Sequence, residues 1–444
     1  MIPAATSTGA APWAGLAPTR RVLANGVTVI VKESRTTPAV TIHASLGAGS
    51  VLDPPELDGL AHFVSQTIDR GTQSHTADEI AEALDARGAS LAVSASRHTL
   101  SLVCTCLVED LAEMLMLVAD IVRRPVFPEA EVETRRGEIM TAIGQDADNP
   151  AVVAMDGVLS DLYGARHPYG RPSRGTLASA ARVDRAAMLR FHAETIGPAG
   201  VTLAVVGDIG AEAGLDAVMR AFGDWTEAVT VGSGAARSPH RSDPVPSPPP
   251  AATARRVRVL PMMHKSQADI AYGFITIARN DPSYGAYWLL NNILAQYSIG
   301  GRLGENIRER QGMAYYVFSA FEPGVIPGPF VIRAGVSAAN VERALAAIDA
   351  ELRAFIANGP TDREMNESKQ YSIGALPREL ETNAAIASFL VTSEYFGLGL
   401  DYELRVPALL ESVTRADVHA AALASLDPSR ATIVVAGPYD GSSM

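Results

Sequence analysis

The spacing of hydrophobic and polar residues in the first half of the chain predicts strands interleaved with helices. Asn25-Gly26 separates two short strand-like runs, which is typical of a tight hairpin. Residues 39–47 form a further β-rich run, and residues 91–107 alternate like two paired strands. Helical spacing or helix start signals are found at residues 58–70, 76–88, 110–123, 128–144, 151–163 and 183–194, before a strand at 201–206.

The end of this half recurs at the end of the chain. Residues 182–188 align with residues 412–418, Pro198 aligns with Pro428, and residues 202–206 align with residues 432–436. The separation is constant at 230 positions, as 428 − 198 shows. A helix, a proline and a strand at one offset indicate two homologous halves.

Each half mixes hairpin strands with helices, which predicts an α+β fold with a mainly antiparallel sheet and helices packed on one face. We expect four segments, which are a flexible leader at 1–18, an N-terminal domain at 19–232, a Pro-rich linker at 233–255 and a C-terminal domain at 256–444.

Composition narrows the classes of function. The net charge of −12 and the pI near 5.3 argue against binding to nucleic acids or anionic membranes, and weakly favour basic or unfolded peptide partners. No apolar run reaches the roughly 20 residues of a membrane span. Cys104 and Cys106 point to one face of a predicted strand, and we expect a small buried pair that is not bonded to itself.

Localisation stays open. Residues 1–18 show no basic segment followed by an apolar one, so no signal peptide is visible. Both the cytoplasm and the periplasm, after removal of a signal, fit the sequence, and the periplasm is slightly favoured.

The segment His62-Phe-Val-Ser-Gln66 has the frame of a zinc-binding helix. In H-x-x-E-H, two histidines four residues apart bind Zn²⁺, and the glutamate activates the bound water. Here Ser65 replaces the glutamate and Gln66 replaces the second histidine. A neutral amide is a poor Zn²⁺ ligand, and an unactivated serine is no base near neutral pH.

The surrounding residues, Gly59–Phe63 and Arg70-Gly-Thr72, resemble the metal-site segment of the pitrilysin and mitochondrial-processing-peptidase family of zinc metallopeptidases. The resemblance implies a fold of the LuxS and processing-peptidase type. It also implies that the family's third zinc ligand aligns with Ala142. The downstream Asp148-Asn-Pro150 supports this alignment. Glu138, one helical turn earlier, is a candidate stand-in, although a solvated carboxylate is the better interpretation.

We therefore expect a dead metal site in which His62 is a structural residue. The other histidines, such as His75 and His98, show no ligand spacing with His62 and are interpreted as surface or satisfied polar groups.

Residues 300–319 resemble the family's second signature, in which an arginine and a tyrosine seven residues apart reach the catalytic chamber. These residues are Arg308 and Tyr315, and Tyr316 points to the opposite strand face. In the family the pair holds the substrate carbonyl and stabilises the oxyanion. The alternative is that Arg308 belongs to a charged helix face and that Tyr315 is a core residue.

The resemblance implies a non-catalytic subunit of a heterodimeric zinc endopeptidase. A homologous partner chain would carry the zinc, and this chain, without a metal or cofactor of its own, would supply Arg308, Tyr315 and half of the chamber. A peptide or unfolded-protein substrate would add as a strand to a sheet edge near His43–Gly49. Two alternatives remain, namely an inert peptide-binding or structural scaffold, and a homodimeric peptidase with an unrecognised metal site at His62 and Glu138.

Overall fold

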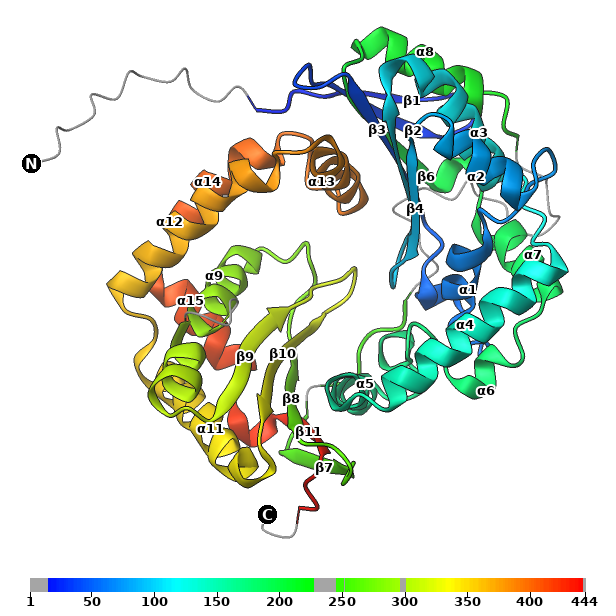
Figure 1. Ribbon diagram of the computed structural model, residues 1–444. Coiled ribbons are helices and arrows are strands. Elements are labelled where there is room, and N and C mark those ends of the chain that lie inside the picture. Colours follow the sequence, from blue (N-terminus) through cyan, green and yellow to red (C-terminus); the bar gives the residue numbers. More distant parts are fainter. Residues whose placement is uncertain (1–14, 227–244, 251, 296–300, 442–444) are drawn as a thin grey trace, which may run out of the picture.

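The computed structural model describes residues 15–226, 245–250, 252–295 and 301–441. In this part of the chain two sheets, each with its own helices, form two halves around a central opening (Figure 1). Most of the predicted leader, and residues 233–244 of the predicted linker, lie outside the described residues.

The first sheet has the strand order β1-β2-β6-β3-β5-β4. All neighbouring strands are antiparallel except β2 and β6, which are parallel. Asn25-Gly26 turns β1 into β2, as predicted. The strands are β1 (Thr19–Val22), β2 (Thr28–Glu33), β3 (Ala39–Leu46), β4 (Ser90–Ala95), β5 (Leu100–Leu107) and β6 (Val201–Gly207).

The second sheet has the order β7-β11-β8-β10-β9 and again contains one parallel pair, β7 with β11. This order repeats that of β2-β6-β3-β5-β4, so β9 is the counterpart of β4. The strands are β7 (Arg256–Pro261), β8 (Ala268–Ile275), β9 (Ala314–Phe321), β10 (Pro329–Val336) and β11 (Thr432–Gly437). The predicted two-fold repeat and the mainly antiparallel α+β fold are confirmed.

Helices cover the outer face of each sheet (Figure 1). Those of the first half are α1 (Leu60–Thr67), α2 (Ala77–Asp85), α3 (Leu111–Arg123), α4 (Glu129–Ala147), α6 (Leu177–Ala180), α7 (Arg185–Thr195) and α8 (Ala211–Phe222). Those of the second half are α9 (Tyr284–Ala295), α10 (Gly301–Leu303), a π-helix (Gly304–Arg310), α11 (Val341–Asn358), α12 (Asp362–Glu379), α14 (Tyr402–Ser412) and α15 (Arg415–Ser425).

The remaining two helices are exchanged between the halves. Helix α5 (Pro150–Tyr163) follows α4 in sequence, yet it packs on the inner face of the second sheet, where Val158 meets Ala271 and Val434. Helix α13 (Asn383–Tyr395) packs in the same way on β3 and β6 of the first sheet. The inner face of each sheet is therefore partly covered by a helix from the other half.

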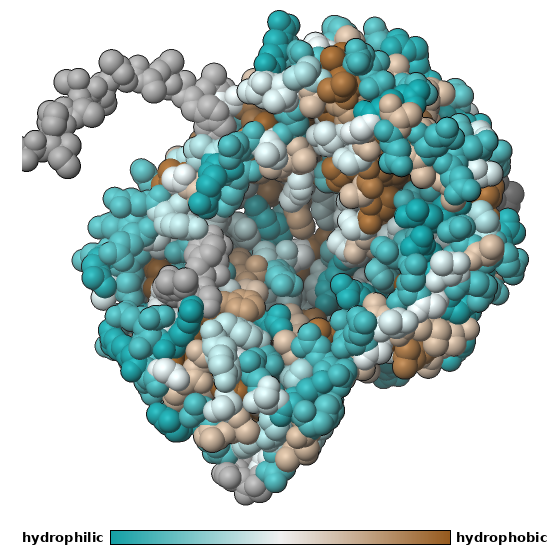
Figure 2. Space-filling model, in the orientation of Figure 1, coloured by the Kyte–Doolittle hydropathy of each residue, from teal (hydrophilic) through white to brown (hydrophobic). Residues whose placement is uncertain are grey.

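The space between the halves is hollowed in the space-filling view (Figure 2). We call it the chamber. It is framed by α13, β4, α5 and the strands β9 and β10 (Figure 1). The uncovered parts of both inner sheet faces line this space.

Candidate functional site

Helix α1, which carries the predicted metal-site positions, is fixed at its N-terminus by a buried carboxylate. The two oxygens of Asp53 accept hydrogen bonds of 2.8 Å from the backbone N–H groups of Gly59 and Ala61. Gly59 has a φ of +87°, and a β-carbon there would lie 2.5 Å from the carbonyl oxygen of Arg174. Only glycine fits this entry into the helix.

The two replaced metal-site positions on α1, Ser65 and Gln66, are neutral and make contacts within the helix. Ser65 is 1% exposed, and its hydroxyl donates to the carbonyl of His62 at 2.7 Å. The amide nitrogen of Gln66 lies 3.4 Å from the Ser65 hydroxyl oxygen. The serine hydroxyl is therefore turned back onto its own helix.

Helix α4 packs against α1 and carries the third position, Ala142, which is half-buried. The candidate stand-in, Glu138, is exposed and forms an ion pair with Arg135 at 2.5 Å. One turn after Ala142, Asp146 pairs with Arg174 at 2.9 Å. Burial and the nearby Arg174 charge lower the pKa of His62, against a smaller opposing effect of Asp146.

These residues do not fit the zinc ion of an H-x-x-E-H site. Of the four family positions, which are occupied here by His62, Ser65, Gln66 and Ala142, only His62 is a residue that commonly ligates zinc. Structural and catalytic zinc sites need at least three protein ligands. In the parts of the chain that the structure describes, no group of three or more His, Cys, Asp or Glu side chains is arranged to hold a metal ion.

Arg308 and Tyr315 flank one tight turn, between the π-helix and β9. Arg308 lies on the π-helix, and its carbonyl accepts a hydrogen bond from the Gly312 N–H as the chain turns into β9. Tyr315 is the second residue of β9 and is 67% exposed, so the alternative that it is a core residue is wrong.

Tyr316 follows a β-bulge at Tyr315, where Ala314 pairs with Val336 and Tyr316 with Gly335, so strand alternation does not relate the two tyrosines. Tyr316 faces the inner side of the second sheet, where its hydroxyl donates to the buried carboxylate of Asp269. Arg333 lies over the ring of Phe318 on the same face, 5.5 Å from its centroid. Tyr316 is therefore already bound within the sheet, whereas Tyr315 is exposed.

The sheet edge beside α1 is not at residues 43–49. Strand β3 lies in the middle of its sheet, between β5 and β6. The hairpin of β4 and β5 adds two strands outside β3, so that β4 (Ser90–Ala95) becomes the edge and packs beside α1. The expectation of a substrate edge near His43–Gly49 is therefore wrong.

The interpretation of the two other histidines also needs correction in part. His75 is half-exposed and bonded to Asp120, as expected of a satisfied polar group. His98 is different, because its Nδ1 is buried and has no hydrogen-bond partner among the described residues. His43, which the sequence did not single out, has both ring nitrogens in this condition. The sequence contains a pattern that points to His43, because Thr41, His43 and Ser45 alternate with the apolar residues of β3 and so share its polar face.

Cys104 and Cys106 are buried on β5 and unbonded, as predicted. Burial raises the pKa of Cys104 to about 12 and that of Cys106 to about 11, so neither thiol is a nucleophile near neutral pH.

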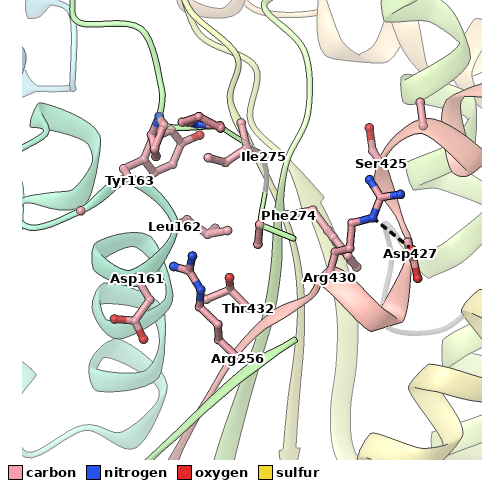
Figure 3. Close-up of a pocket in the computed structure, with 15 residues that line it drawn as sticks. Asp161, Leu162, Tyr163, Arg256, Phe274, Ile275, Ser425, Asp427, Arg430 and Thr432 are labelled. Carbon is pink, nitrogen blue, oxygen red and sulfur yellow. Dashed lines mark ion pairs between the residues drawn. The ribbon is translucent and has the colours of Figure 1, made fainter. Parts of the chain in front are cut away.

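Three cavities stand out. One of about 790 Å³ adjoins the predicted metal-site positions and is lined by Asp146, Asp156 and Arg174, among others. A second, of about 200 Å³, lies between the end of α5 and the second half. Figure 3 shows the ion pair of Arg430 with Asp427 on one side of this cavity, and the side chains of Arg256 and Asp161 on the other side, with no ion pair drawn between them. Asp161 pairs instead with Arg258. A third, of about 270 Å³, lies between α13 and the β4–β5 turn.

No helix in the described residues is long and apolar enough to cross a membrane.

Residues 28–176 match the sequence profile of the insulinase family, peptidase family M16, and residues 182–371 match that of the peptidase M16 inactive domain.

Similar proteins span most of the chain. An uncharacterized zinc protease of Mycobacterium tuberculosis is 28% identical over 96% of this chain and 95% of its own length. The alpha subunit of the potato mitochondrial-processing peptidase is 27% identical over 42% of this chain and 36% of its own. The crystal structure of a peptidase M16 inactive domain from Pseudomonas fluorescens superposes with a TM-score of 0.85 and 26% identity, covering 95% of this chain and 98% of that one. The chain therefore belongs to peptidase family M16, the pitrilysin-like metallopeptidases, and has the features of a non-catalytic member.

Proposed function

We propose that this chain is the non-catalytic subunit of a heterodimeric zinc metalloendopeptidase. A homologous partner with an intact H-x-x-E-H motif would carry the zinc and the general base. This chain would supply Arg308, Tyr315 and half of the chamber wall. The observation that carries the proposal is the contrast between Ser65, Gln66 and Ala142, none of which can ligate zinc, and an arginine–tyrosine pair of which Tyr315 is 67% exposed.

Arg308 and Tyr315 would act electrostatically, by stabilising negative charge on the substrate. When water attacks a peptide carbonyl, negative charge develops on its oxygen, and donors placed at that oxygen lower the barrier. A guanidinium and a phenol are both such donors. Strand β9, which carries Tyr315, lies across the central opening from α1 and α4 (Figure 1).

The edge strand β4 offers a place for an extended peptide. Ser90, Ala92 and Ser94 are exposed on it, and β5 is its only strand neighbour among the described residues. A peptide strand would pair with the unpaired backbone groups of this edge, which gives affinity without strong sequence preference.

The test is peptidase activity and zinc content, measured on this chain alone and after mixing with a homologous chain that has an intact H-x-x-E-H motif. The expected result is a zinc-free, inactive chain that forms an active, zinc-containing heterodimer. Stoichiometric zinc and cleavage by the isolated chain would contradict the proposal. A complex, or a chain, that binds peptide but never cleaves it would instead support the scaffold function.

A further inference from the structure

The hairpins that carry the edge strands β4 and β9 meet at their tips. The hairpin of β4 and β5 ends in a turn at residues 96–99, and the hairpin of β9 and β10 ends in a turn at residues 322–328. In the two-fold repeat β9 is the counterpart of β4, and β10 is the counterpart of β5. Among the described residues β4 and β9 are each bonded to one strand only, so contacts at the turns help to fix where each edge lies.

Both turns contact the side chain of Tyr169, which is 2% exposed. Its hydroxyl oxygen lies 2.6 Å from Nε2 of His98 in the β4–β5 turn. A β-carbon on Gly324 of the β9–β10 turn would lie 2.0 Å from the same oxygen, so only glycine fits there. Burial raises the pKa of Tyr169 to about 12, against smaller opposing effects that include the backbone N–H groups of Val325 and Ile326. One phenol therefore joins a turn of the first half to a turn of the second.

Tyr169 is held in place by the residues around it. It lies in the 3₁₀ segment Pro168–Gly170, which follows α5. His167 uses both ring nitrogens, because Nδ1 accepts from the Tyr169 N–H at 3.0 Å and Nε2 donates to the Pro246 carbonyl at 2.8 Å. The guanidinium of Arg97, in the β4–β5 turn, lies 5.3 Å from the centroid of the Tyr169 ring. The ring and the backbone of Tyr169 are thus both fixed, which suits a rigid link.

We propose that Tyr169 is a positioning residue, which sets the distance between the peptide-binding edge of β4 and Tyr315 on β9. The inference rests on the proposed function, because that function assigns the peptide to β4 and an oxyanion donor to Tyr315. A displacement of about 1 Å at a reacting group can lower a rate by about 10²-fold. Two edges that belong to different halves therefore need a fixed link, and Tyr169 contacts both hairpins.

The distance can be measured on the chain alone, without zinc or a partner subunit. Nitroxide labels are attached at Ser94→Cys on β4 and Tyr315→Cys on β9, where both positions are exposed. The native Cys104 and Cys106 are buried and stay unlabelled. Double electron–electron resonance is expected to give one narrow distance distribution, which broadens when Tyr169→Phe removes the hydroxyl group.

Tyr163→Phe is the matched control. Tyr163 is 3% exposed, and its ring lies 5.2 Å from that of Tyr169. Its hydroxyl donates to the Pro327 carbonyl of the β9–β10 turn at 3.0 Å, so this bond goes to one of the two turns. Both variants lose one buried hydroxyl bond and are expected to unfold at similar urea concentrations, but only Tyr169→Phe should broaden the distribution. Equal broadening in both variants, or none in Tyr169→Phe, would overturn the proposal.

The kinetics of the heterodimer separate positioning from a purely structural role. Tyr169→Phe is expected to lower kcat by about tenfold and to leave KM within about twofold, because β4 still binds the peptide but holds it at a less defined distance from Tyr315. A structural loss alone would leave kcat per folded, zinc-loaded enzyme unchanged, and that result would also overturn the proposal. An inactive mixture of the unmodified chains would count against the proposed function, and the distance distributions would still decide whether Tyr169 links the hairpins.

Discussion

Tyr315 differs from the other aromatic residues of β9, because its hydroxyl is not held by the sheet. Tyr316 is bonded to Asp269, and Phe318 is covered by Arg333. Tyr315 is 67% exposed, at the start of the strand and directly after the turn that follows Arg308. An exposed phenol on a strand is suited to contact a ligand rather than to stabilise the fold.

The role of this pair can be measured in the reconstituted heterodimer. Arg308→Ala and Tyr315→Phe are each expected to lower kcat by about 10²–10³-fold, the usual loss for one oxyanion donor. Tyr316→Phe is the matched control for folding and packing, because its hydroxyl is bonded within the sheet. Unchanged kcat in both Arg308→Ala and Tyr315→Phe would contradict the assignment.

Glu364 gives a stability prediction that is independent of function. Burial by itself would raise the pKa of Glu364, but hydrogen bonds from Arg302 and Thr361 outweigh it and lower the pKa to about 2, from an ordinary value of 4.5. A carboxyl group with a lowered pKa stabilises the fold above pH 4.5 and loses this effect as the pH falls toward 2.

Glu364→Gln is therefore expected to lower the free energy of unfolding by about 1–2 kcal/mol at pH 7, after allowance for partial exposure, and by progressively less below pH 4.5. Urea unfolding across this pH range measures the effect. Glu367→Gln on the same helix is the control, since Glu367 forms only a 3.8 Å ion pair with Arg363 at the surface. A destabilisation of Glu364→Gln that does not change with pH would show that the loss is one of packing.

The π-helix that carries Arg308 is held by side chains five positions apart. Glu305 pairs with Arg310, and the Gln311 amide donates to Asn306 at 2.8 Å. Asn306 also donates to Glu351 of α11 at 2.6 Å, which ties the π-helix to the body of the second half. Short π-helical segments often occur at functional sites, because they place a side chain where an α-helix would not.

This geometry predicts that Asn306 positions Arg308. Asn306→Ala is expected to lower kcat of the heterodimer by about tenfold, because small displacements of a catalytic donor are costly. Restoring the amide with Asn306→Gln should recover part of the activity. Glu305→Ala, which removes an exposed pair in the same segment, should leave kcat within about twofold. Equal losses in Asn306→Ala and Glu305→Ala would argue against a specific positioning role.

The exchanged helices make the two halves one structure. Helix α5 packs on the second sheet and α13 on the first, and polar contacts join the halves at their margins. Arg20 of β1 pairs with Glu394 of α13 at 2.7 Å, and Arg258 of β7 pairs with Asp161 of α5 at 2.8 Å. Separating the halves would expose both inner sheet faces and both helices to water.

A chain cut within residues 233–244 is therefore expected to remain a single particle. The two fragments, expressed together, should coelute in size-exclusion chromatography at 0.15 M and at 1 M salt, because apolar burial is the main contribution. Fragments that separate at moderate salt would show that the halves are independent and that the linker holds them together.

Much of the fold and of the degenerate metal site could be predicted from local sequence. Periodicity placed α3 at Leu111–Arg123 and α5 at Pro150–Tyr163 within about one residue, and the 230-residue offset predicted the repeat. The sequence alone also showed that the site does not suit zinc, because Ser65 cannot replace the glutamate base and Gln66 cannot replace the second histidine ligand in any fold. These conclusions depend on residue type and on neighbours within a few turns of the chain.

The tertiary structure decided what depends on contacts between distant residues. A strand's alternation shows which residues share a face, but not which strand lies beside it, so the edge at β4 rather than β3 could not be read from the sequence. For the same reason the exchange of α5 and α13 was not predicted. The cavity between α13 and the β4–β5 turn follows from that exchange, since His43 and Tyr395 both line it although more than 300 positions separate them in the sequence.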